Sequence, residues 1–246
     1  MPFELNVPKS LLGILFTITL IAEIRKPYLS AWRGIFKTIP WGRYLGLLVI
    51  MSIVSVSFLP FDESLLMTIQ SVKFPGKDGL VDAGEILGPE SGLWVLLYVA
   101  YFTAYFVGVV RPRRILFHAL LGSVLTGLTA HLLKFAIMRA RPDAGLGCYS
   151  FFHSITPLKS YGPFQSFPSG DVAVVAGAAV YLFLVAKTRG TAWGLLLLPI
   201  VTAVSRIDLN RHWPSDTFFS LGLGLVIGLC LRSFEWADAD QSPSMV

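Results

Sequence analysis

Three cationic side chains stand at the ends of apolar runs, where a charged group is costly unless the protein uses it. In KFAIMRARPD, Lys134 lies seven residues before Arg141. Seven residues are about two helical turns, so both side chains share one helix face. Arg206 ends a later apolar run. Arginine binds phosphate in a bidentate manner and lysine adds a point charge, so the set predicts an anion site.

A helix start supplies further anion-binding groups. In SFPSGDVAVVAG, Ser169 and Gly170 precede an apolar run, and we expect them to open a helix. The N-terminal end of a helix attracts anions through its unpaired N–H groups and its dipole. Asp171 follows directly and places an ionisable group at the edge of the apolar run.

A histidine and an aspartate complete the set. His212 and Asp216 are four residues apart, which lets the carboxylate reach the imidazole if that turn is helical. A histidine paired in this way is a nucleophile or a base held in one tautomer. Cations, helix start and His–Asp pair together predict phosphoryl transfer without a bound metal or cofactor. Each segment alone has an ordinary reading as an interfacial anchor or a helix cap.

The composition predicts what must position these residues. The chain of 246 residues is 54% hydrophobic and 14% charged, whereas soluble domains average about 45–50% and 25%. We therefore expect an all-α integral membrane protein of one domain. The net charge of +5 then concerns topology and anionic lipids, and no basic block with interleaved aromatics indicates nucleic acid.

Hydropathy predicts a six-helix transmembrane bundle. The expected spans are 44–60, 93–110, 115–137, 171–187, 192–207 and 217–233, which together form a domain over residues 44–233. Residues 1–43 read as an N-terminal interfacial amphipathic segment and residues 234–246 as a cytoplasmic tail. A seventh span through the apolar stretch 11–22 is the alternative.

The distribution of lysine and arginine predicts the orientation. Basic residues gather before the first span and in the 111–114 and 187–189 loops, whereas the 61–92 loop carries six acids against two lysines. The positive-inside rule then predicts that both termini lie in the cytoplasm. We expect the membrane to be a bacterial inner membrane. Span ends near 137, 171, 207 and 217 meet on the outer face, where the polar residues described above lie.

The order and spacing resemble the three-part signature of the type-2 phosphatidic acid phosphatase superfamily. The matching residues are Lys134, Arg141 and Pro142; Pro168, Ser169 and Gly170; and Ser205, Arg206, His212 and Asp216. The resemblance implies that His212 attacks phosphorus and forms a phosphohistidine while Asp216 orients it. It also implies that Lys134, Arg141, Arg206, Ser169 and Gly170 bind the phosphate oxygens, with no metal.

One position departs from the family pattern. The second motif of the family ends in a histidine that protonates the leaving oxygen, and this chain has Asp171 there. Asp171 can do the same task by holding a proton at the low-dielectric membrane edge. His153 can stand in for it, or the leaving group is itself a phosphate that needs little help. We expect the neighbouring Arg139 and Arg211 to contact headgroups or the lip of the site.

The resemblance implies a lipid phosphate or lipid diphosphate as substrate. Candidates are phosphatidylglycerophosphate, phosphatidate, undecaprenyl diphosphate and the 1-phosphate of lipid A. Six aromatic residues between 149 and 167 suit a rim through which a lipid enters sideways, or simple membrane anchoring. A lipid phosphotransferase and a non-catalytic lipid-binding or lipid-moving protein are the alternatives, and the oligomeric state stays open.

Overall fold

The computed structural model describes residues 9–24, 39–88, 92–152 and 162–241. These residues form helices and connecting turns, with no strand in the described ranges. The predicted all-α class is therefore confirmed.

The helices follow the predicted apolar ranges closely. The longer ones are α1 (Lys9–Ile24), α3 (Trp41–Phe58), α4 (Asp62–Ser71), α5 (Lys77–Leu87), α6 (Gly92–Val107), α7 (Val110–Ile137), α8 (Gly170–Val185), α9 (Arg189–Asp208) and α10 (Pro214–Gln241). Short 3-10 turns cover Leu59–Phe61, Pro142–Ala144 and Gly162–Phe164. Each predicted span falls on one helix, namely α3 and α6 to α10.

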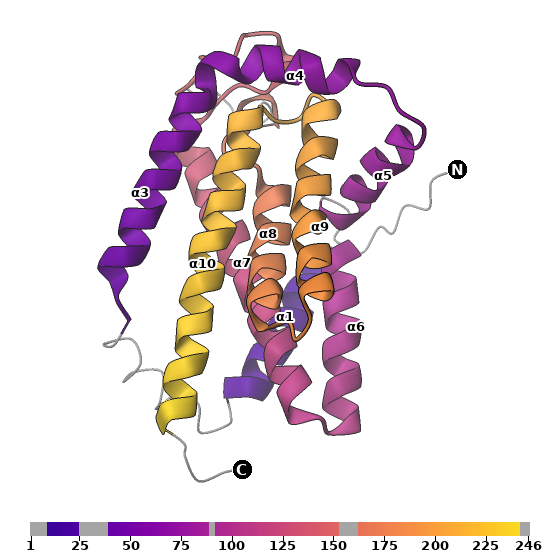
Figure 1. Cartoon of the computed structure of the whole chain (residues 1–246), viewed down its shortest axis with the longest axis vertical. Helices are drawn as coiled ribbons and strands as arrows, with labels where there is room; N and C mark the ends of the chain where they lie inside the picture. The colour runs from indigo at the N-terminus through magenta and orange to yellow at the C-terminus, as the bar shows by residue number, and fades with distance from the viewer. Residues whose placement is uncertain (1–8, 25–38, 89–91, 153–161, 242–246) are drawn as a thin grey trace.

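Helix α8 is the centre of the bundle and packs against α7, α9 and α10 (Figure 1). Small residues permit this close packing. A Cβ on Gly177 would lie 2.4 Å from the Gly122 carbonyl oxygen of α7, and one on Gly224 would lie 2.4 Å from the Ala176 Cβ. Because a hydrogen fits at these contacts and a methyl group would not, the backbone of α8 lies in direct contact with those of α7 and α10.

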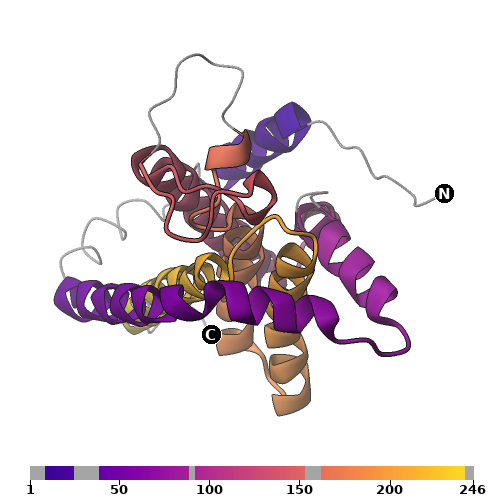
Figure 2. The ribbon, with the colours of Figure 1, turned by 90° about the horizontal axis from the view of Figure 1, so that it is seen from above.

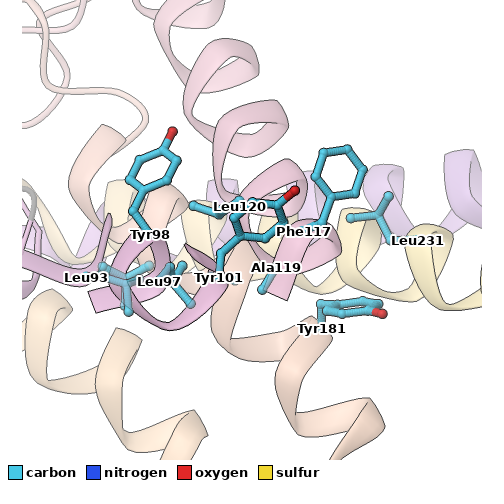
Figure 3. Close-up of a cluster of buried hydrophobic side chains, with 11 residues drawn as sticks. Leu93, Leu97, Tyr98, Tyr101, Phe117, Ala119, Leu120, Tyr181 and Leu231 are labelled. Carbon is cyan, nitrogen blue, oxygen red and sulfur yellow. The ribbon is translucent and has the colours of Figure 1, made fainter. Parts of the chain in front are cut away.

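A cluster of buried apolar side chains joins α6, α7, α8 and α10 (Figure 3). Tyr101, Leu120 and Tyr181 are fully buried within it. Leu15 and Phe16 of α1 pack against the same cluster. Lipid tails are as apolar as these side chains, so close van der Waals packing between the helices is what this cluster contributes to the stability of a membrane bundle.

Helix α1, which lies within the expected interfacial segment, makes specific contacts with the bundle, and the interfacial placement itself stays a prediction. Glu23 is buried, accepts a hydrogen bond from the Tyr101 hydroxyl at 2.8 Å and lies 3.0 Å from Nε of Arg113. A buried carboxylate is tolerated because these partners offset its desolvation. Helix α1 thus packs on α6 and α7. The rest of the segment up to residue 38 lies outside the described residues.

Helix α4 crosses the end of the bundle that carries the predicted site. It lies across the ends of α9 and α10 (Figure 1), and it continues the line of α3 when seen from above (Figure 2). Asp62, its first residue, is fully buried. The turn from α3 into α4 therefore places the Asp62 carboxylate in the interior, at the end of the bundle that α4 crosses.

Four helical stretches of the described chain are long and apolar enough to cross a membrane: Trp41–Ser71, Val110–Ala144, Arg189–Asp208 and Pro214–Ser233. A fifth exists if α5 and α6 count as one span bent by 58°. Helix α8 is apolar but has only 16 residues. These helices support an integral membrane protein, and the count of six spans stays a prediction.

Candidate active site

The predicted site residues lie where the ends of α7 and α9 meet the starts of α8 and α10. The expectation that Lys134 and Arg141 share one helix face is wrong, because α7 ends at Ile137 and Arg141 lies in extended backbone beyond it. The ammonium of Lys134 lies 3.9 Å from where a Cβ on Gly170 would stand. Nη1 of Arg206 lies 4.0 Å from the Asp171 carboxylate. The His212 ring contacts the backbone just before α8, at Ser166. Residues far apart in the sequence therefore form one cluster.

His212 is almost completely buried and its ring is held in one tautomer. Its Nδ1 lies 2.7 Å from the carbonyl oxygen of Ser166. A carbonyl oxygen only accepts, so Nδ1 carries the hydrogen and donates it. In the neutral ring, Nε2 then has a free lone pair, which is what a nucleophile needs.

The surroundings keep this ring neutral. Burial lowers the pKa of His212 below the ordinary value of 6.5, and the positive charge of Lys134 lowers it further, while Asp216 opposes the shift. Because the folded-state pKa is lowered, the neutral ring persists through neutral pH and is lost only as pH falls through the lowered value.

Asp216 lies beside His212 but is not its nearest acceptor. Oδ2 of Asp216 is 3.8 Å from Nδ1 of His212. The carboxylate accepts hydrogen bonds from the Ser166 hydroxyl, from the Trp213 backbone N–H at 2.9 Å and from Arg139. The Trp213 contact is half of a capping box at the start of α10. Asp216 thus fixes the two segments that hold the histidine ring, Ser166 and the 212–213 turn.

Arg139 corrects the sequence-based expectation of a headgroup or lip contact. Its side chain is fully buried, and its guanidinium lies between two carboxylates. Nη1 donates to Asp216, and Nη2 donates to Asp62 at 2.6 Å. Nε donates to the Cys148 carbonyl at 3.0 Å. Every nitrogen of the side chain therefore has a partner.

Asp62 is the second carboxylate of this network and was not singled out from the sequence. It accepts from the Ser215 backbone N–H at 2.8 Å and from the Ser215 hydroxyl. The rings of Phe151 and Trp213 lie 4.9 and 5.5 Å from the Arg139 guanidinium. Asp62 is 77 residues from Arg139, so no local spacing could have linked them.

Arg141 and Arg206 have donors that the protein leaves unused. Nε of each is buried, and no acceptor among the described residues lies within hydrogen-bond distance. Buried N–H groups are almost always paired in folded proteins, so two such donors in one cluster call for an explanation. An anion with several oxygens would satisfy both.

The remaining predicted phosphate ligands lie at the start of α8. Lys134 donates to the Gln165 carbonyl at 2.9 Å, beside that helix. Ser169 is fully buried, and its hydroxyl accepts from the Val172 N–H at 3.5 Å as the N-cap of α8. Ser169 therefore caps the N-terminus of α8. Gly170 follows as the first residue of α8.

Asp171 faces the cation cluster, by which we mean Lys134, Arg141 and Arg206. Its side chain is 31% exposed, in contrast to the buried His212. A Cβ on Gly88 would lie 2.9 Å from the Asp171 Cβ, so the end of α5 packs against it. The carboxyl is thus next to the cations and accessible. His153, the alternative to it, lies outside the described residues.

Helix α5 forms a wall of the site that sequence reasoning missed. The Ser205 hydroxyl donates to the Val81 carbonyl at 2.7 Å, and Glu85 lies 3.4 Å from Nη2 of Arg206. In the sequence analysis, the charges of residues 61–92 served only to predict the membrane topology. The acids among them were counted as charges, and nothing in their spacing marks Glu85.

The aromatic residues near the site divide into two groups. Tyr149 and Phe152 are 64% and 75% exposed and can contact lipid. Phe151 packs on Arg139, and the ring centroid of Phe167 lies 4.8 Å from that of Phe219 on α10. The first group is exposed as either a rim or a membrane anchor requires, while the second supports the site from within; Tyr161 lies outside the described residues.

Comparison with known proteins agrees with this geometry. Residues 115–239 match the PAP2 superfamily. That range includes every residue of the three-part signature, and the chain belongs to this superfamily. The resemblance stated from the sequence is thereby confirmed.

Two curated relatives are similar to this chain over part of their length. Lipid A 1-phosphatase of Rhizobium etli is 34% identical over 131 residues, which are 52% of this chain and 48% of the relative. Decaprenylphosphoryl-5-phosphoribose phosphatase of Mycobacterium tuberculosis is 29% identical over 167 residues, 64% of this chain and 85% of the relative. The chain spans about half the length of the rhizobial relative.

A solved structure shares the fold. The PAP2-type transmembrane phosphatidylglycerolphosphate phosphatase from Bacillus subtilis aligns with a TM-score of 0.59 at 18% identity, over 78% of this chain and 96% of that one. Its similarity supports the helical membrane architecture.

The buried ion pairs of Arg139 generate the first prediction. Replacing Arg139 by Met leaves two buried carboxylates unpaired, and we expect it to cost about 3–5 kcal/mol of stability. Arg211→Met is the matched control, because Arg211 is half-exposed and its contact with Asp143 is 3.4 Å; we expect a loss below about 1 kcal/mol. Thermal unfolding in detergent checks both. Equal losses of stability in the two variants would contradict the stabilising role of the buried Arg139 ion pairs.

Proposed function

We propose that this protein is a membrane lipid phosphatase that hydrolyses a lipid phosphomonoester or diphosphate through His212. One observation carries the proposal: a buried neutral histidine, His212, lies in the same cluster as Arg141 and Arg206, whose Nε donors have no acceptor among the described residues. A phosphate dianion has the charge and the oxygens to satisfy the cations while its phosphorus faces Nε2.

The reaction proceeds in two steps. The Nε2 lone pair of His212 attacks phosphorus, the bond from phosphorus to the leaving oxygen breaks, and a phosphohistidine forms. Water then attacks the same phosphorus, the P–N bond breaks, and inorganic phosphate leaves. Lys134, Arg141 and Arg206 neutralise charge on the non-bridging oxygens in both steps, with the Gly170 N–H and Ser169 as further ligands. These groups supply the positive charge without a metal.

Asp171 is the group best placed to handle protons. It lies beside Arg206 and is reachable from outside the buried cluster. As a carboxylic acid it donates a proton to the leaving oxygen in the first step, and as a carboxylate it accepts a proton from water in the second. This assigns to Asp171 the role that the family pattern gives to a histidine.

The membrane setting supports a lipid as the carrier of the phosphate. We propose six spans, with α5–α6 and the short α8 completing the set, both termini in the cytoplasm and the site at the outer face of an inner membrane. The exposed Tyr149 and Phe152 support entry of an amphiphile from the bilayer. The name of the rhizobial relative favours the 1-phosphate of lipid A among the candidates.

The test is release of phosphate from a panel of lipids by the purified protein. We expect hydrolysis of at least one of phosphatidylglycerophosphate, phosphatidate, undecaprenyl diphosphate and lipid A, and loss of that activity in His212→Ala. His131→Ala is the matched control, because His131 is exposed on α7 and its ring lies 4.9 Å from the ring of Phe135. Equal phosphate release by His212→Ala would contradict the mechanism.

The same panel separates the alternatives. Transfer of the phosphoryl group to a second lipid in place of water would make the protein a phosphotransferase. Lipid binding without turnover, and without competition from vanadate, would indicate a lipid-binding or lipid-moving protein.

The role of Asp171 gives a further prediction. General acid catalysis is worth about 10²–10⁴-fold on a poor leaving group and much less on a good one. We therefore expect Asp171→Asn to lower the rate on an alkyl phosphate far more than on a nitrophenyl phosphate. Asp143→Asn removes the same charge from the exposed lip and serves as control. A uniform loss across leaving groups would contradict the proton-donor role.

A further inference from the structure

Helix α5 brings a second carboxylate to the cation cluster. Oε1 of Glu85 lies 3.4 Å from Nη2 of Arg206, while Asp171 lies 4.0 Å from Nη1. The Arg206 guanidinium therefore stands between two carboxylates, one on each terminal nitrogen. Any phosphate that binds Arg206 meets both negative charges.

The two partners of this ion pair differ in their freedom to move. The Arg206 side chain is 4% exposed, and its Nη2 also donates to the Ser205 hydroxyl at 3.2 Å. The Glu85 side chain is 46% exposed. Arg206 is thus held in place, whereas Glu85 can turn toward solvent without opening the core.

The backbone of α5 cannot make the same movement. A Cβ on Gly84 would lie only 2.4 Å from the Ser205 Cβ, so α5 and α9 are in close contact there. The Ser205 hydroxyl also donates to the Val81 carbonyl at 2.7 Å. A change at Glu85 is therefore confined to its side chain, and the helix keeps its place against the site.

We propose that Glu85 competes with phosphate for Arg206 and thereby promotes release of the phosphate product. Without an anion, Glu85 occupies Nη2 of Arg206. A bound phosphate takes its place and repels it, and the returning carboxylate weakens the hold on inorganic phosphate. The inference rests on the proposed function for its biological meaning, but the competition itself requires only anion binding at Arg206.

Binding of inorganic phosphate to the purified full chain in detergent, followed by calorimetry, tests the proposal without any turnover. We expect Glu85→Gln, which keeps the shape and removes the charge, to tighten phosphate binding about two- to fivefold, the range for a partly exposed ion pair. Glu85→Asp, which keeps the charge on a shorter side chain, should tighten it less.

The control removes a charge from the same helix without touching Arg206. Asp82 is exposed on α5, one turn before Glu85, and we expect Asp82→Asn to bind phosphate as the unaltered protein does. Equal tightening by Asp82→Asn and Glu85→Gln would show that the effect comes from the net charge of the protein and would overturn the proposal. Unchanged or weaker phosphate binding in Glu85→Gln would overturn it as well. Phosphate binding without lipid hydrolysis would contradict the proposed function alone.

Discussion

The geometry of the site depends on one buried cation. The Arg139 guanidinium joins Asp62 at the start of α4 to Asp216 in the first turn of α10, and all three side chains are fully buried. A buried charge without partners costs several kcal/mol, so these groups must stay together once the bundle has formed. The network therefore ties together three parts of the chain that are distant in sequence.

The position of the histidine follows from that network. Asp216, held by Arg139, accepts from Ser166 and Trp213, and Ser166 in turn accepts from the Nδ1–H of His212 through its carbonyl. The ring is thus oriented through two fixed backbone segments more than by direct contact with the carboxylate. Because the ring is buried and its hydrogen is committed to Nδ1, the neutral ring keeps a lone pair on Nε2, as the nucleophilic role that we propose requires.

Hydropathy and short motifs predicted much of this protein from its sequence. The apolar ranges fall on helices because a bilayer demands long uninterrupted helical segments. Lys134, Arg141, Arg206 and His212 could be identified because the family signature keeps them at fixed spacing. That their segments meet followed from the positive-inside rule and the alternation of spans.

The rest depends on contacts between distant segments, which local patterns do not reveal. Arg139 is adjacent to the signature, and from the sequence alone it resembles a residue that extends its charge to the membrane surface. Only the structure shows its buried ion pair with Asp62. Glu85 is one of several acids in a loop, and only the packing of Gly84 on Ser205 brings it to Arg206. The Ser166 carbonyl is a backbone group and has no sequence signal at all. Tertiary packing decides each of these roles.

The most direct measurement of the central claim is detection of a phosphate on His212 during turnover. Protein reacting with a phosphate-labelled lipid substrate is quenched within the first turnovers, and the label is located by peptide mapping. Our account predicts an acid-labile, base-stable phosphoryl group on His212. Continued release of phosphate with no label on His212 at any quench time would contradict it.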